Sequence, residues 1–244
     1  MDLHACFHTD DKKYAMQTIS GNTFSNQLIS EKTKPNTNAL GGRIWDEETL
    51  YWKCDTHYQW LTDSQIEGIV KDALLESSLQ TPLKIQKKNR KMSDAQLVLS
   101  WLPKKDDRYL TSNSILAYCW GPGSGLGGNC IMNADVLWLL REGKLYADEA
   151  KRLGYIDNFV DPKNTIKYFD PVHTIKHELA GHGLGMNHIT DIRQEKTAIM
   201  YPFYNGLRKF GDADIKYLQS LYGSAKVNKS ILDVIREKIQ NFAR

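Results

Sequence analysis

Residues 177–188 read HELAGHGLGMNH, a stretch that holds three histidines, one glutamate and three glycines. His177 and His182 are five positions apart, so a regular α-helix would separate their side chains by about 140°. A single wide turn with i→i+5 hydrogen bonding takes up one extra residue, and such π-bulges are frequent at functional sites. We therefore predict that Ala180 is looped into a bulge, which returns His182 to the same face as His177.

Three histidines and a glutamate within twelve residues are the residue types of a catalytic zinc site, although the first two histidines are one residue further apart than in the zinc-protease signature H-E-x-x-H. Zinc in such a site takes three protein ligands and leaves a position open to water, whose proton a nearby carboxylate can accept. His177, His182 and His188 are the candidate ligands, and Glu178 is the candidate base. Gly185 lies midway between the second and third histidines, where a left-handed glycine can end the helix and turn the chain back.

Two other interpretations of these histidines remain open. They could be unrelated surface residues, although four of the seven histidines in the chain lie within residues 173–188. His173 and His177 are also four positions apart and could form a two-ligand face on a regular helix. That pairing gives Glu178 no evident role and leaves Gly185 unexplained, so the three-histidine interpretation is favoured.

Length and composition are those of an ordinary soluble globular protein. The 244 residues are 41% hydrophobic and 25% charged, which suits one sizeable domain with extensions. The net charge of +3 is too small to indicate a nucleic-acid or membrane partner. No run approaches the about 18 apolar residues of a membrane span, and no apolar signal sequence is visible. The four cysteines form no CxxC pair and predict no particular disulfide.

Hydrophobic periodicity predicts one α+β domain with a mixed sheet over residues 43–223, between an extension at 1–42 and an amphipathic helix at 224–244. Strands are expected over residues 49–55, 83–88, 96–102, 114–120 and 130–133. Helices are expected over residues 64–79, 135–154, 171–184 and 212–222.

Local signals place the ends of these elements. Ser64 and Glu67 fit a capping box for the first helix. Asp170 is a candidate N-cap of the histidine-bearing helix, and Pro171 suits the first helical position, where its missing N–H costs nothing. The stretch GPGSGLGGN at 121–129 lacks the Lys-Ser/Thr of a phosphate-binding loop and is interpreted as a turn between strands.

Several of these motifs resemble one known family. HELAGHGLGMNH is similar to the metzincin consensus H-E-x-x-H-x-x-G-x-x-H with Ala180 inserted. AIMYPFY at 198–204 resembles the methionine turn and pocket wall of the matrix metalloproteinases, or matrixins, and FGDADIKYLQSLYG at 210–223 resembles their final helix. LAYCWGPG at 116–123 is similar to the edge strand on which matrixins bind substrate. The resemblance covers about residues 43–223.

The resemblance implies a zinc-dependent endopeptidase with a metzincin-like fold: a twisted mixed sheet, a long active-site helix and a C-terminal helix. One catalytic Zn²⁺ would be bound by the three histidines of the motif, His177, His182 and His188. Glu178 would act as general base and then as general acid, and Met200 would form the floor beneath the metal. Such enzymes act on protein or peptide substrates and imply an extracellular setting.

The resemblance also implies where a substrate binds. Leu116 and Ala117 would hold an extended peptide along the edge strand, where main-chain hydrogen bonds supply affinity. Pro202 and Tyr204 would line the pocket for the residue after the scissile bond. We therefore expect a medium or large apolar residue at that position of the substrate.

The chain departs from the family at other positions. Tyr118 stands where the resemblance would place a structural-zinc histidine, and residues 127–135 lack the family's histidine and much of its acidic calcium cluster. We therefore expect no structural zinc and leave calcium open. No PRCGxPD latency segment is visible in residues 1–42, so we expect the chain to be active without removal of a large propeptide.

A protein of another class is the alternative. It would be a non-catalytic binding or structural protein that keeps the matrixin fold, with a metal site degraded by the inserted Ala180. The presence of Glu178 disfavours this alternative, because a structural zinc ion needs no base.

Overall fold

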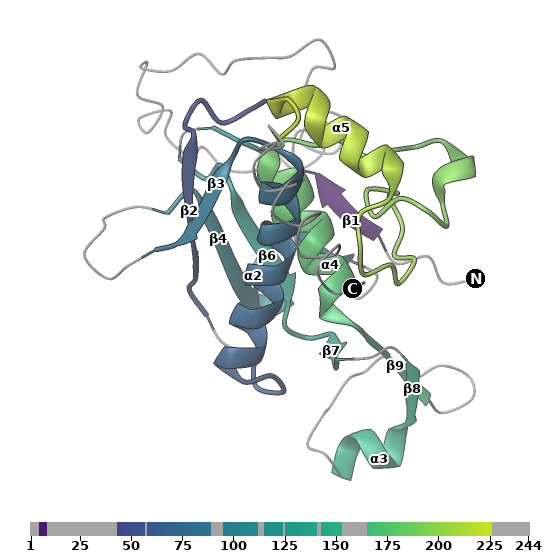
Figure 1. The fold of residues 1–244 in the computed structure, drawn as a ribbon. Coiled ribbons are helices and arrows are strands. Elements are labelled where there is room, and N and C mark those ends of the chain that lie inside the picture. Colours follow the sequence, from purple (N-terminus) through teal and green to yellow (C-terminus); the bar gives the residue numbers. More distant parts are fainter. Residues whose placement is uncertain are drawn as a thin grey trace, which may run out of the picture.

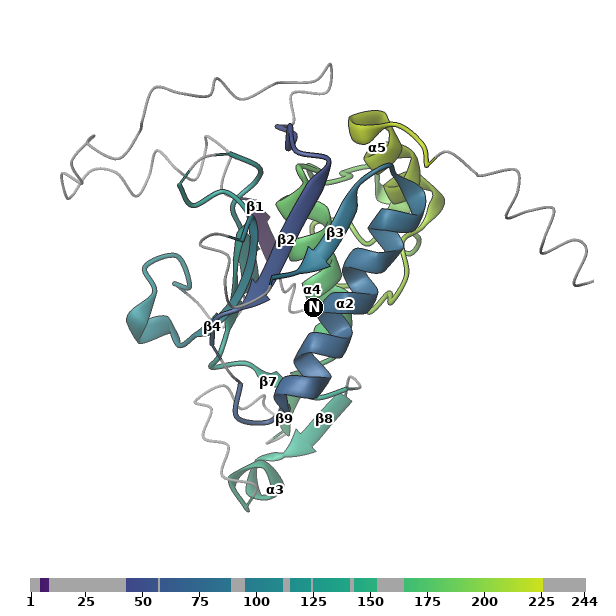
Figure 2. The same cartoon turned by 60° about the vertical axis from the view of Figure 1, so that its left-hand side comes forward.

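The computed structural model describes residues 5–8, 43–56, 58–88, 95–111, 115–123, 125–140, 143–152 and 165–225. One main sheet has the strand order β1-β5-β6-β4-β2-β3. Its strands are β1 (Ala5–His8), β2 (Thr49–Cys54), β3 (Lys84–Lys87), β4 (Leu97–Leu102), β5 (Ile115–Cys119) and β6 (Asn129–Asn133). Figure 2 shows that α2 (Asp63–Gln80), α4 (Pro171–Ile175) and α5 (Asp212–Tyr222) all lie on one side of this sheet.

The main sheet is mixed, as predicted. β4 pairs in parallel with β2 and β6, and β2 pairs in parallel with β3, whereas β5 runs antiparallel to β6. β4 reads LVLSWL and is buried along almost its whole length, which is typical of a central strand with parallel neighbours. Among the described strands after residue 43, β5 is the outermost on its side, and β1 adds to its free edge in the parallel direction.

Helix α2 begins two residues earlier than its predicted capping box. The Thr62 hydroxyl accepts from the Gln65 N–H at 3.2 Å, and the Gln65 side chain accepts from the Thr62 N–H at 2.8 Å. The capping-box prediction from Ser64 and Glu67 was therefore wrong. The four residues from Thr62 and the four from Ser64 both fit the capping-box pattern. The earlier start places Asp63 in the first turn, where a negative charge stabilises the helix.

The predicted helix over residues 135–154 was also wrong. This region forms β7 (Leu137–Trp138), β8 (Gly143–Tyr146) and the short α3 (Ala147–Arg152). β7 and β8 pair with β9 (Thr165–Phe169) in a small second sheet, at the lower end of the domain in Figure 1. Trp138 is fully buried with its ring against Trp101 and Phe169, so tertiary pairing outweighs local helix propensity here.

A disulfide joins β5 to β6. Cys119 and Cys130 face each other in the strand register, and their sulfur atoms are bonded. The sequence had left all cysteine pairing open. The described residues contain no helix long and apolar enough to cross a membrane. Most of the expected helix at 224–244 lies outside the described residues.

Short helical turns complete the described secondary structure. They are the π-helical turn Lys176–Gly181 and the 3₁₀ turns Lys104–Asp106, His182–Leu184 and Ile192–Gln194. The helix that carries the histidine motif therefore consists of α4, the π-helical turn and the 3₁₀ turn His182–Leu184 in succession. The residues between β5 and β6 that the structure describes form turns, as the glycine-rich sequence predicts.

Candidate active site

The helix that carries the histidine motif starts as the sequence predicts. The Asp170 carboxylate accepts from the Val172 N–H at 3.0 Å, and Pro171 occupies the first helical position. Residues 173–186 are all buried, because this helix packs against both the main sheet and α2. The polar side chains of the motif are therefore held in a largely dry environment.

The predicted wide turn is present. The His182 N–H donates to the carbonyl of Glu178 and also to that of His177, and the second of these is the i→i+5 bond of a π-bulge. Ala180 is fully buried within this turn. A Cβ added to Gly181 would lie 2.2 Å from the Met200 sulfur, so the absence of a side chain lets Met200 approach the turn closely.

Gly185 ends the helix in the left-handed conformation, with φ +90°. Its N–H donates to the His182 carbonyl at 2.8 Å, and the next N–H, from Met186, donates to the Gly181 carbonyl at 3.1 Å. A Cβ at Gly185 would lie 1.9 Å from the Arg43 carbonyl oxygen, so a larger residue would be excluded by space as well as by φ. The chain reverses here and brings His188 back toward the helix.

The three candidate ligands converge on one point. The Nε2 atom of His188 lies 3.2 Å from the Nε2 atoms of both His177 and His182, and the possible ligand atoms all lie within 4.8 Å of one another. His177 and His182 are fully buried, whereas His188 is partly exposed and marks the side of the group that is open to solvent.

Main-chain carbonyls fix the tautomers of the two buried histidines. The Nδ1 of His177 lies 2.7 Å from the Ile199 oxygen, and the Nδ1 of His182 lies 2.7 Å from the Met186 oxygen. A carbonyl oxygen can only accept, so each Nδ1 carries the hydrogen and each Nε2 keeps a lone pair. The Nε2 atoms of His177, His182 and His188 therefore form a group able to hold a metal ion, and imidazole nitrogens suit zinc.

His173 lies outside this group, which disfavours the two-ligand interpretation based on His173 and His177. Its Nδ1 donates to the Leu207 carbonyl at 3.0 Å, and its ring packs edge-on against Tyr204 at 4.7 Å between centroids. Burial lowers the pKa of His173 to about 4, so this imidazole is neutral at pH 7. Glu178 is fully buried within the π-helical turn, one residue after His177.

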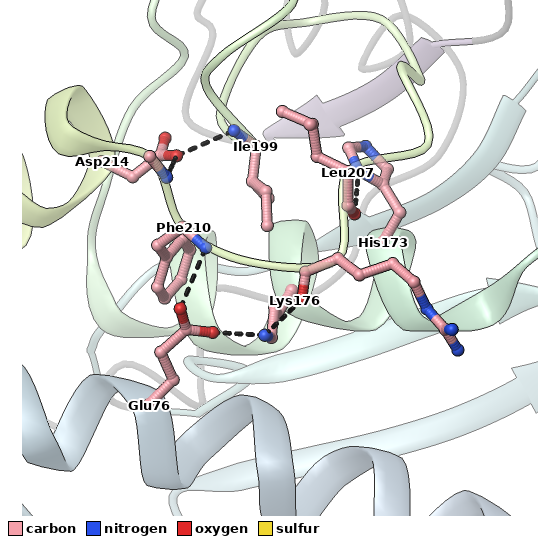
Figure 3. A network of polar contacts seen from close by, with 9 residues as sticks. Glu76, His173, Lys176, Ile199, Leu207, Phe210 and Asp214 are labelled. Atoms are coloured by element: carbon pink, nitrogen blue, oxygen red, sulfur yellow. Dashed lines mark hydrogen bonds and ion pairs between the residues drawn. The ribbon is translucent and has the colours of Figure 1, made fainter.

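The buried carboxylate of Asp214, which the sequence did not indicate as functional, stabilises the segment next to the histidine group. Asp214, in the first turn of α5, accepts from the N–H groups of Ile199 at 2.8 Å, Met200 at 3.0 Å and Gly211 at 2.8 Å. Burial raises the pKa of Asp214, and the three N–H donors partly offset this rise. Asp214 therefore holds the segment whose Ile199 carbonyl orients His177 (Figure 3).

The candidate substrate residues belong to two separate segments of the chain. Leu116 and Ala117 are buried in β5, and Ala117 is paired in register with Cys6 of β1. Pro202 and Tyr204 are partly buried. The Tyr204 hydroxyl accepts from the Asp170 N–H at 3.3 Å, which places this ring beside the start of the histidine-bearing helix.

Tyr118 forms a hydrogen bond where the family resemblance would place a metal ligand. Its hydroxyl donates to an oxygen of the Asp107 carboxylate at 2.6 Å. The other oxygen of Asp107 accepts from the N–H groups of Tyr109 and Leu110. Burial raises the pKa of the Tyr118 hydroxyl, so it remains a proton donor at neutral pH.

A mixed sheet, two histidines on a buried helix and a third histidine on the segment after Gly185 together form the architecture of a zinc metalloprotease domain. The sequence model of the Matrixin family matches residues 44–223, so the chain belongs to the matrixin family.

The similar proteins include matrix metalloproteinases. Macrophage metalloelastase from Oryctolagus cuniculus is 25% identical over 189 residues, which cover 75% of this chain and 34% of that protein. Neutrophil collagenase from Homo sapiens is 23% identical over 188 residues, 75% of this chain and 34% of that protein. Matrilysin from Homo sapiens is 35% identical over 112 residues, 44% of this chain and 32% of that protein. The chain spans about a third of the length of these relatives.

Proposed function

We propose that this chain is a zinc-dependent endopeptidase that hydrolyses peptide bonds of protein substrates by glutamate-assisted attack of water. The convergence of the three Nε2 atoms within 4.8 Å is the observation that carries this proposal. The Nδ1 atoms of His177 and His182 bind main-chain carbonyls, so the Nε2 atom of each ring is free of the hydrogen and can bind a metal ion. The non-catalytic alternative, which requires a site spoiled by Ala180, is disfavoured because the π-helical turn accommodates that residue.

The residues of the chain divide the chemistry between them. His177, His182 and His188 would hold one Zn²⁺, which would supply Lewis-acid polarisation of the substrate carbonyl and a more acidic water. Glu178 would accept a proton from the attacking water and return it to the leaving amine. Met200, packed against the π-helical turn, would form an apolar floor beneath the histidine group.

Substrate would bind as an added strand along β5. Leu116 and Ala117 would offer their main-chain groups to an extended peptide, which gains affinity independently of its side chains. Pro202 and Tyr204 would line the pocket for the residue after the scissile bond. The Tyr204 ring has apolar faces, and its centroid lies 5.1 Å from that of the Phe169 ring. These apolar surroundings favour an apolar substrate side chain.

Metal analysis of the purified chain, combined with cleavage of a peptide library, tests this function. We expect one zinc ion per chain and cleavage before medium or large apolar residues. A library profile with an acidic or basic preference after the scissile bond would contradict the pocket assignment. A chain that holds no metal and cleaves no peptide would establish the non-catalytic alternative.

Strand β1 leads to a prediction that differs from the sequence-based expectation of an active full chain. β1 pairs with β5 from Ala5 to His8, along the edge where a substrate strand would have to bind. A site occupied by its own chain for about nine-tenths of the time binds substrate about 10-fold more weakly. Because β1 and substrate would exclude each other from this edge, we expect removal of residues 1–8 to raise kcat/KM, and a rise of about 10-fold would correspond to that occupancy.

The control for this truncation removes residues 1–4 and leaves β1 in place. It should behave like the full chain in the same peptide-cleavage assay. Equal activity of all three proteins would show that β1 does not compete with substrate, and would support the original expectation.

A further inference from the structure

The segment 204–211, which we call the wall loop, follows Met200 and leads into α5 without forming a helix or strand. Its main-chain polar groups need partners wherever they are buried. The wall loop begins at Tyr204, the proposed wall of the specificity pocket. Its position relative to the metal ligands would therefore decide which substrate side chain fits.

Side chains from two helices bind three main-chain groups of the wall loop (Figure 3). His173 donates to the Leu207 carbonyl at 3.0 Å, and the Lys176 ammonium donates to the Arg208 carbonyl at 2.6 Å. A third contact comes from α2, where the Glu76 carboxylate accepts from the Phe210 N–H at 3.0 Å.

Lys176 and Glu76 also form an ion pair with each other. The Lys176 side chain is only 7% exposed and that of Glu76 is 21% exposed, so both are largely removed from water. Burial of a charge pair is costly and often gives no more stability than apolar residues would. Each member of this pair, however, also forms a hydrogen bond with a main-chain group of the wall loop: Lys176 with the Arg208 carbonyl and Glu76 with the Phe210 N–H. Apolar residues could not form these bonds.

The pair connects the wall loop directly to the metal-binding helix. Lys176 is the residue immediately before His177, in the same π-helical turn. Glu76, on α2, binds Lys176 and also accepts from the Phe210 N–H near the end of the wall loop. A shift of the wall loop relative to His177 would therefore break one of these contacts.

We propose that the Lys176–Glu76 pair is a positioning device that fixes the wall loop against the metal-binding helix and so sets selectivity for the residue after the scissile bond. This inference rests on the proposed endopeptidase function. Neither residue is assigned a contact with substrate or metal. Their effect is exerted through the main chain of Arg208 and Phe210, and through these on Tyr204.

Single substitutions separate the pair while keeping the size of each side chain. Lys176→Met removes the donor to Arg208. The two oxygens of Glu76 accept separately from Lys176 and Phe210, so Glu76→Gln replaces one of these acceptors by an NH2 group that can only donate. For the best peptide substrate we expect KM to rise about 10-fold with kcat changed by less than about 3-fold, because binding rather than chemistry is affected. The preference between apolar side chains after the scissile bond should flatten, and metal content should stay unchanged.

A double substitution distinguishes positioning from a merely structural role. Lys176→Met combined with Glu76→Leu removes both buried charges, so the melting temperature should return toward that of the native chain. Selectivity should stay flattened, because nothing then holds the Arg208 carbonyl or the Phe210 N–H. If the double variant recovered both stability and selectivity, the positioning role would be refuted.

The matched control is Glu67→Gln. Glu67 lies on α2, as Glu76 does, and forms an ion pair with Lys87 of β3. That pair is exposed, with side-chain exposures of 42% for Glu67 and 52% for Lys87. We expect it to leave KM, selectivity and melting temperature unchanged, since exposed pairs contribute little.

Hydrogen exchange at the Phe210 amide gives a readout that does not need catalysis. We expect exchange to accelerate about 10-fold or more in both single variants and in the double variant, but not in Glu67→Gln. Unchanged exchange in the variants would overturn the positioning role even if the enzyme is active. A native chain that cleaves no peptide, while its variants still show faster exchange, would refute the endopeptidase function and leave the anchoring of the wall loop intact.

Discussion

Replacement of Glu178 by glutamine is expected to lower kcat/KM for peptide cleavage by about 10³-fold or more. Glutamine keeps the size of the side chain but cannot accept the proton of the attacking water. The metal should remain, because the proposed ligands are the three histidines, and the carbonyls of Ile199 and Met186 that bind two of them are unaffected. Activity and bound zinc are measured on the same preparation.

The control is Glu47→Gln, which makes the same chemical change at an exposed position. It should retain full activity and full zinc content. Undiminished turnover in Glu178→Gln would remove Glu178 from the mechanism. Loss of zinc together with activity would instead show that Glu178 maintains the site and does not act as its base.

Replacement of Asp214 by alanine is expected to destabilise the fold by about 3 kcal/mol or more, because two buried N–H groups and one partly buried N–H group lose their acceptor. In a domain of this size, that corresponds to a fall in melting temperature of about 6–12 °C. The Ile199 carbonyl that orients His177 belongs to the released segment, so zinc affinity should also fall by about 10–100-fold.

Asp212→Ala is the matched control for this variant. Asp212 lies in the same first turn of α5, but its side chain is exposed. Its replacement should change the melting temperature by no more than about 2 °C and leave zinc affinity unaltered. A stable Asp214→Ala protein with normal zinc affinity would show that the Ile199–Met200 segment holds its shape without the carboxylate.

The sequence by itself determined the features that depend on local geometry. Five-residue spacing between His177 and His182 is incompatible with one face of a regular helix, so a wide turn was the solution that kept both histidines together. Gly185 was predictable because its position between the second and third histidines required a reversal that glycine makes without strain. Most strands were also predictable, since their β-branched and aromatic residues favour extended structure over short segments.

Only the tertiary structure decided which distant groups meet. Nothing in the local sequence shows that Asp214 binds the Ile199 N–H or that Glu76 reaches Lys176, because these contacts join segments far apart in the chain. The same reason explains the wrong helix at 135–154, where pairing of β7 and β8 with β9 outweighs local propensity. The candidate ligands could be identified from their spacing, whereas the hydrogen bonds that orient them could be identified only after the chain had folded.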